Sequence, residues 1–131
     1  MATSGFTKVN LRGLDDMAPR FGLSPSVEAR FARRALRSEI GGLGLLRLAP
    51  NARAPFGHRH AQQEELYVVV AGSGRARLDD EIVDVGPWDV LRVAPETMRA
   101  FEAGPDGLEY LAFGAPVAPE PDSELVPGWW D

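Results

Sequence analysis

The stretch HRHAQQEELYVVVAG, residues 58–72, decides how this chain is interpreted. His58 and His60 are two residues apart, and on a β-strand that spacing points both imidazoles to the same face. Glu65 follows, and a carboxylate arriving from the next stretch of chain can complete a three-ligand group. Two neutral imidazoles and one carboxylate suit a divalent transition metal such as Fe, Mn, Zn or Ni. The sequence therefore predicts a metal site made by His58, His60 and Glu65.

Short apolar runs separated by turn residues indicate an all-β protein. The sequence has 14 glycines and 11 prolines, and runs near the common strand length lie between them. The strongest run is residues 66–70, which is rich in β-branched and aromatic residues. Ala71-Gly72-Ser73-Gly74 is interpreted as a turn, and Asp79-Asp80 as the next one. The expected strands are 43–49, 65–70, 74–78, 81–85, 89–93 and 108–113, an arrangement typical of a sandwich or barrel.

The two ends of the chain are less regular. Residues 14–17 are expected to form a short helical turn. Residues 27–36 fit a helix by composition and a strand by alternation around Phe31. We favour the strand, because Gly41-Gly42 would then make a hairpin with 43–49. Four prolines between 115 and 128 predict an irregular tail. Trp129-Trp130 is interpreted as a tail docked on the domain or at a dimer interface.

Composition narrows the class of protein. A chain of 131 residues is expected to form one domain, 1–131. The absence of cysteine excludes disulfides and thiolate metal sites. No apolar run suggests a membrane span or a secretory signal, so a cytoplasmic protein is expected. The net charge of −5 argues against a nucleic-acid partner. Residues 1–78 hold 12 basic and 6 acidic groups, whereas residues 79–131 hold 2 basic and 13 acidic groups. A fold that pairs early strands with late strands would bring these opposite charges together.

At this point the chain resembles the cupin superfamily of small β-barrels. In the first cupin motif, three or four residues separate His-x-His from a Glu, and six further residues separate that Glu from a Gly. His58, His60, Glu65 and Gly72 match these spacings. Glu64 would suit a three-residue gap, but the distance to Gly72 selects Glu65. The usual turn glycine before the motif is missing, and Pro50-Asn51 is expected to turn instead.

The second cupin motif is eroded. It is anchored on Asp89 and Pro95, and Arg99 stands where the family has its histidine ligand. A guanidinium has no lone pair to give a metal. The resemblance covers Leu43–Phe113. It implies a cupin jelly roll (a double-stranded β-helix barrel) with an N-terminal extension and an irregular C-terminal tail, and it implies a homodimer.

Arg99 has two interpretations. It can form a salt bridge with Glu65 or Glu102, or it can bind a carboxylate or phosphate of a substrate through two hydrogen bonds. Alternation places Tyr67 on the face of Glu65, and Phe101 on that of Arg99. We therefore predict Arg99, Tyr67 and Phe101 as substrate-binding residues, although such side chains also simply fill a small barrel. Glu102 is a fallback metal ligand.

Three functions are compatible with these residues. The first is a metal-dependent enzyme acting on a small anionic substrate; cupins include oxygenases, isomerases and lyases, and the fold chooses none of them. The second is a metal-free binding or sensing module centred on Arg99. The third is a partner-binding protein that dimerises through its edge strands and the Trp129-Trp130 tail. Nothing in the sequence indicates a catalytic nucleophile.

Overall fold

The computed structural model describes residues 5–131, and its regular secondary structure consists mostly of antiparallel strands. Three short helices lie in the first third of the chain. They are η1 (Leu11–Gly13), η2 (Ala18–Phe21) and α1 (Arg33–Leu36). The strands are β1 (Val27–Phe31), β2 (Gly42–Leu48), β3 (Phe56–His60), β4 (Glu64–Leu78), β5 (Glu81–Val85), β6 (Val90–Val93), β7 (Arg99–Ala115) and β8 (Ser123–Pro127). The all-β prediction is confirmed. None of the helices described in 5–131 is long and apolar enough to cross a bilayer.

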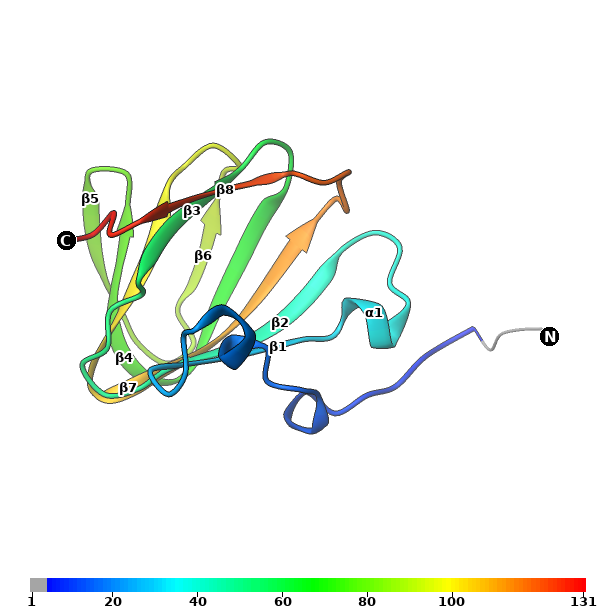
Figure 1. The fold of residues 1–131 in the computed structure, drawn as a ribbon, viewed down its shortest axis with the longest axis horizontal. Coiled ribbons are helices and arrows are strands. Elements are labelled where there is room, and N and C mark those ends of the chain that lie inside the picture. Colours follow the sequence, from blue (N-terminus) through cyan, green and yellow to red (C-terminus); the bar gives the residue numbers. More distant parts are fainter. Residues whose placement is uncertain (1–4) are drawn as a thin grey trace.

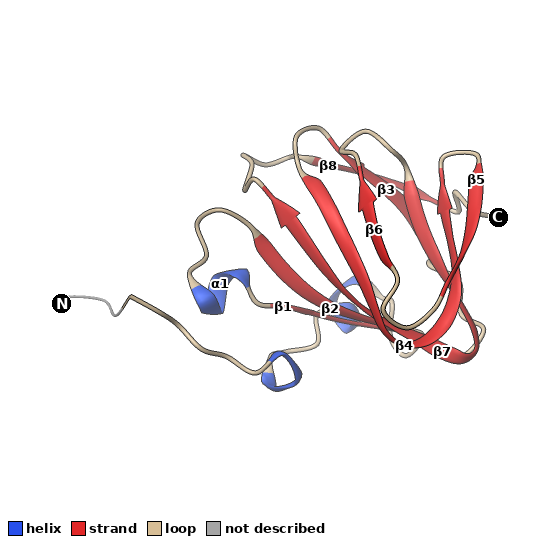
Figure 2. Ribbon diagram, turned by 180° about the vertical axis from the view of Figure 1, so that it is seen from behind, coloured by secondary structure: helices blue, strands red, loops and turns tan. Residues whose placement is uncertain are grey.

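One sheet curls on itself to form the barrel (Figure 1). The strand order is β1-β2-β7-β3-β8, and β4 pairs with β5, β6 and β7. The long strands β4 and β7 run beside each other through the whole molecule, as the view from behind also shows (Figure 2). Strands β1 and β8 are the two ends of the order. The curled sheet therefore has an opening between these two edges.

Strand β4 continues through the segment that the sequence predicted to be a turn, so that prediction is wrong. Its register with β7 shifts between Val69 and Ala71 and again between Gly72 and Gly74. Gly72 has φ +74°, and a Cβ there would lie 2.1 Å from the carbonyl oxygen of Gly107. The glycines thus make bulges that bend one long strand, and the turn comes only at Asp79-Asp80, as predicted.

The N-terminal prediction is partly right. Residues 27–31 form β1 and pair with β2 as expected, but the chain then enters α1, so the link is longer than a hairpin. Residues 14–17 are not helical; the helical turns lie on either side of them. The carboxylate of Asp16 instead accepts the N–H of Ala29 at 2.9 Å, which occupies the free edge of β1.

The C-terminal tail is more regular than its prolines suggested. Residues 123–127 form β8 against β3, with His58 opposite Leu125. The predicted docking of the two tryptophans is confirmed. Trp130 is buried, and the guanidinium of Arg53 lies 5.1 Å from its ring. The guanidinium of Arg77 lies 4.1 Å from the ring of Trp129.

Ion pairs join the basic first part of the chain to its acidic second part, as predicted. Arg53 and Arg75 both bind Glu102, and Arg59 binds Glu124. From the sequence, Trp88 is expected to pack at the start of a strand, but it is 74% exposed with φ +71°, so that expectation is wrong. Asn51 has φ +61°, which confirms the turn expected there.

Candidate functional site

The predicted metal ligands converge where the chain passes from β3 to β4. His58 and His60 lie on β3, and Glu65 is the second residue of β4. Alternation along β4 buries Glu65 and leaves Glu64 exposed on the opposite face. The Oε1 atom of Glu65 lies 3.1 Å from Nε2 of His58 and 3.0 Å from Nε2 of His60. The three residues therefore meet at one point, and Glu64 does not join them.

These separations fit a bound metal ion. Two donors at right angles about a metal, each about 2.1 Å from it, are about 3 Å apart. Each imidazole nitrogen lies at about that distance from the carboxylate oxygen, and one ligand atom from each of the three residues lies within 4.8 Å of the others. Among residues 5–131 this is the one group of three or more possible ligands of this kind. The donor set of two nitrogens and one oxygen fits a divalent transition metal.

Asp122 fixes the orientation of His60, and the sequence analysis missed it. Its Oδ2 lies 3.0 Å from Nδ1 of His60, and its oxygens also accept the backbone N–H groups of Gln62 and Gln63. An ionised carboxylate only accepts, so Nδ1 of His60 carries the hydrogen. Its Nε2 lone pair then faces Oε1 of Glu65, and a proton or a metal ion must lie between them.

Replacing Asp122 with asparagine is expected to weaken metal binding by about 10-fold or more. An outer carboxylate that orients a histidine ligand typically contributes 10- to 100-fold to affinity. Competition of the protein with a chromogenic chelator for Ni²⁺ measures the change. The matched control is Glu124→Gln. This change removes an exposed carboxylate that lies two residues after Asp122 and binds Arg59 instead of a histidine. Equal losses in the two variants would show that Asp122 does not position the ligand.

Glu65 is held in its ionised form. Burial opposes ionisation, but hydrogen bonds from His58, His60 and Tyr67 outweigh it and lower the pKa of Glu65 far below its ordinary value. The Tyr67 hydroxyl donates to Oε1 at 2.6 Å. Burial raises the pKa of Tyr67 well above its ordinary value, with the charge of Glu65 adding to the effect, so the phenol keeps its hydrogen. Glu65 therefore presents a permanent negative charge to the site.

Arg99 lies behind this carboxylate and is fully buried, at 0% exposure. One terminal nitrogen lies 3.4 Å from the carbonyl oxygens of both His58 and Pro95, and the other donates to the carbonyl of Ala94 at 3.1 Å. Its Nε lies 4.0 Å from Oε1 of Glu65 and makes no hydrogen bond. The side chain thus joins β3, the 94–95 loop and Glu65. Its contact with a substrate stays a prediction.

Glu102 was predicted as a possible salt-bridge partner of Arg99 and as a fallback metal ligand, and both predictions are wrong. Its carboxylate binds Arg53 at 2.7 Å and Arg75 at 2.6 Å, so it neither pairs with Arg99 nor joins the histidines. Both arginines also contact Trp130. Glu102 therefore belongs to the cluster that anchors the C-terminal tail.

Two cavities open beside the histidines. The larger, of about 630 Å³, includes Arg99 and Phe101 in its lining, together with His58. The smaller, of about 550 Å³, is lined by both histidines and Glu65. Tyr67 lines neither of them; its ring packs edge-on against Phe101 at 5.0 Å, beneath Glu65. Of the three predicted substrate-binding residues, two thus reach a cavity next to the candidate metal ligands.

Comparison with known proteins gives likenesses of structure alone. No protein-family profile and no curated protein sequence matches the chain. A cupin protein from Bacteroides fragilis is 21% identical over 88% of both chains, with a TM-score of 0.72. Oxalate decarboxylase from Bacillus subtilis is 23% identical over 95% of this chain, with a TM-score of 0.77. The nucleoside dehydratase Pac13, from Streptomyces, is 17% identical over 92% of this chain and 90% of its own, with a TM-score of 0.74.

The chain spans only 33% of the length of oxalate decarboxylase, so that likeness concerns one part of a larger protein. Identities of this size bear on the fold and leave the activity open. The curled antiparallel sheet and the position of the His58, His60 and Glu65 group at the connection from β3 to β4 agree with the motif found in the sequence. The chain therefore has the fold of the cupin superfamily.

Proposed function

We propose that this protein binds one divalent transition-metal ion through His58, His60 and Glu65 and uses it to act on a small anionic organic molecule. The observation that supports this most strongly is the convergence of two Nε2 atoms on one carboxylate oxygen at 3.0–3.1 Å. When bound, such an ion polarises a ligand oxygen and offers coordination positions to substrate and water. The reaction class is open, since the fold carries many chemistries.

The surrounding residues have separate tasks in this proposal. Asp122 keeps the hydrogen of His60 on Nδ1, so the lone pair of Nε2 is free to bind the metal ion. Tyr67 and Arg99 hold Glu65 as an anion from the buried side. The cavities give a small organic molecule access to the same point from the open side. Oxalate decarboxylase and Pac13 are enzymes by name, which favours the enzymatic form of the proposal over simple metal storage.

A metal-free module centred on Arg99 has less support. Binding a carboxylate through two parallel hydrogen bonds needs a free pair of guanidinium nitrogens. In this chain both terminal nitrogens are engaged with backbone carbonyls. We also propose a cytoplasmic homodimer, as the sequence and the family resemblance suggested.

Metal affinity is expected to fall with acidification, beginning above pH 6.5. Burial lowers the pKa of His60, but the hydrogen bond and charge of Glu65 outweigh it, so the net pKa is raised above 6.5. Without metal, protonated His60 stabilises the fold below pH 6.5, and this contribution is lost as the pH rises through the raised pKa. A metal ion must displace that proton, so affinity drops about 10-fold per pH unit below the raised pKa.

Calorimetric titration of Mn²⁺ or Ni²⁺ into chelator-treated, untagged protein tests the proposed function. The expected result is one site per chain, with affinity increasing from pH 5.5 to 7.5 and with proton release on binding. Glu65 stays ionised throughout this range. Absence of saturable binding at pH 7.5 would overturn the proposed function, and equal affinity at pH 5.5 and 7.5 would show that the imidazoles are not the ligands.

A further inference from the structure

We propose that the ligand of this site is a monocarboxylate with an aromatic or branched aliphatic body, whose carboxylate lies at the metal and whose body fills the larger cavity. This inference rests on the proposed function and adds the substrate class. It depends on three features of the described chain: the lining of the larger cavity, the exposed apolar residues at the opening of the barrel, and the charge of the site.

The larger cavity is lined almost entirely by apolar side chains. Its volume, about 630 Å³, lies within the 300–1,000 Å³ range of small-molecule sites. Its lining also includes the polar residues His58, Arg99 and Ser123. Much of its wall consists of large apolar side chains: Phe21, Leu23, Phe31, Leu46, Phe56, Phe101 and Tyr110. A molecule that is polar throughout would leave this wall against water, so the lining favours a ligand with an apolar body.

Small residues around the site keep this space open. Ala29, Ala54 and Ala100 lie in the wall of the larger cavity, where bulkier side chains would fill a barrel of this size. Gly44 lies in the wall of the smaller one, and a Cβ there would lie 3.0 Å from the ring of Phe31. The ring of Phe31 therefore lies against the backbone of β2.

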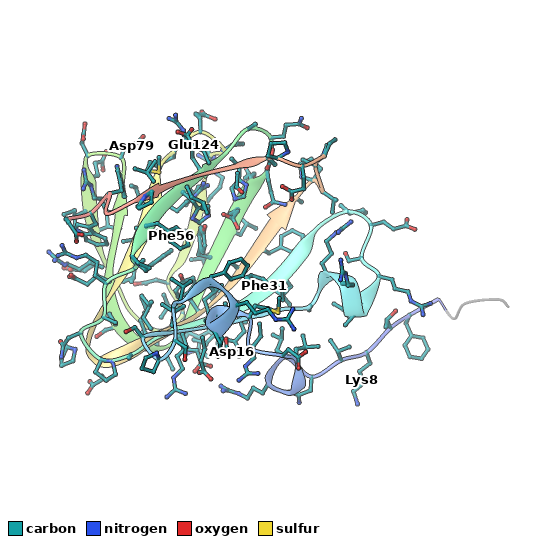
Figure 3. All side chains as sticks on the ribbon, in the orientation of Figure 1. Lys8, Asp16, Phe31, Phe56, Asp79 and Glu124 are labelled. Atoms are coloured by element: carbon teal, nitrogen blue, oxygen red, sulfur yellow. The ribbon has the colours of Figure 1, made fainter. Side chains whose placement is uncertain are left out.

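Three exposed apolar side chains surround the opening. Phe21 is 68% exposed, Phe31 52% and Leu125 56%, and all three line both cavities. Phe31 and Leu125 come from β1 and β8, the two edges that the curled sheet leaves apart. Phe31 and Phe56 point from opposite sides toward the space between them (Figure 3). Apolar surface gathered around a concave site marks a place where apolar groups bind.

The charge of the site selects an anionic head group. Arg99 is a fully buried cation, and Glu65 and Asp122 are the carboxylates in contact with the histidines. With a dication bound and both imidazoles neutral, positive charge exceeds negative charge by one. A single carboxylate on the ligand restores balance inside a low-dielectric site. A dicarboxylate would reverse the imbalance and place its second charge against the apolar wall.

Calorimetry on Ni²⁺-loaded, untagged protein tests the proposal with three probes: 3-phenylpropionate, propionate and succinate. We expect 3-phenylpropionate to bind at least 10-fold more tightly than the other two. Leu125→Gln is expected to weaken 3-phenylpropionate binding about fivefold while the affinity for Ni²⁺ is unchanged. The matched control is Ile82→Gln, an exposed apolar strand residue that lines neither cavity. It is expected to change neither value.

The outcomes separate this inference from the proposed function. If Ni²⁺ does not bind, both the proposed function and this inference are overturned. If Ni²⁺ binds but the three probes bind alike, the inference is overturned and the proposed function stands. If 3-phenylpropionate binds equally well to the chelator-treated protein, the carboxylate does not lie at the metal, and the inference is overturned as well.

Discussion

Replacing His58 with alanine is expected to lower the affinity for a divalent metal by at least about 100-fold. The change removes one of the three metal-ligand atoms that meet at a single point. Loss of a direct ligand should exceed the 10- to 100-fold effect of removing an outer partner. Affinity is measured by competition with a chromogenic chelator, and circular dichroism shows whether the barrel is retained.

The two neighbouring glutamates give a matched control for this result. Glu65→Gln removes the charged donor that both imidazoles contact and should have an effect comparable to His58→Ala. Glu64→Gln changes the adjacent exposed carboxylate on the opposite face of β4 and should leave affinity unchanged. If Glu64→Gln abolished metal binding and Glu65→Gln did not, the ligand assignment would be wrong.

Replacing Arg99 with methionine is expected to lower the free energy of unfolding by about 3 kcal/mol or more. Removing one partner of a buried charged pair typically costs 3–5 kcal/mol, because the other charge stays buried without compensation. Here the change leaves Glu65 without the buried guanidinium behind it, whose Nε lies 4.0 Å from Oε1. It also removes the hydrogen bonds to the carbonyls of His58, Ala94 and Pro95. Urea denaturation at pH 7 measures the difference.

Arg59→Met is the control for the Arg99 variant. Arg59 pairs with Glu124 at 2.7 Å, but both side chains are about half exposed, and such surface pairs contribute at most about 1 kcal/mol. A small loss for Arg59→Met beside a large one for Arg99→Met would assign Arg99 a structural role at the site. If Arg99→Met were as stable as the wild type, the guanidinium would instead be free for a ligand.

The central part of the site was predictable because it depends on local sequence. His58, His60 and Glu65 follow one another within eight residues, and strand alternation alone brings the histidines to one face. The spacing to Gly72 correctly selected Glu65 over Glu64. Spacing within one short stretch of chain is a local property, so it can be inferred without knowing how distant strands pair.

The sequence predictions that were wrong concern features that do not depend on local sequence. Gly72 and Gly74 have local turn chemistry, yet β4 pairs continuously with β7 and uses them as bulges. Prolines in the tail suggested irregularity, but Pro127 ends the edge strand β8, where a missing N–H costs little. Asp122 reaches His60 across 62 residues of sequence, and no local signal marks it. Each of these depends on strand pairing between distant parts of the chain.

Elemental analysis by plasma mass spectrometry tests the central claim most directly. The protein should be untagged, because a histidine tag would add its own metal site, and it should be measured as purified and after soaking in Fe, Mn, Zn and Ni. The account predicts close to one transition-metal ion per chain, lost in His58→Ala. Metal-free protein after every soak would contradict it, and the convergence of His58, His60 and Glu65 would then be a hydrogen-bonded cluster inside the barrel.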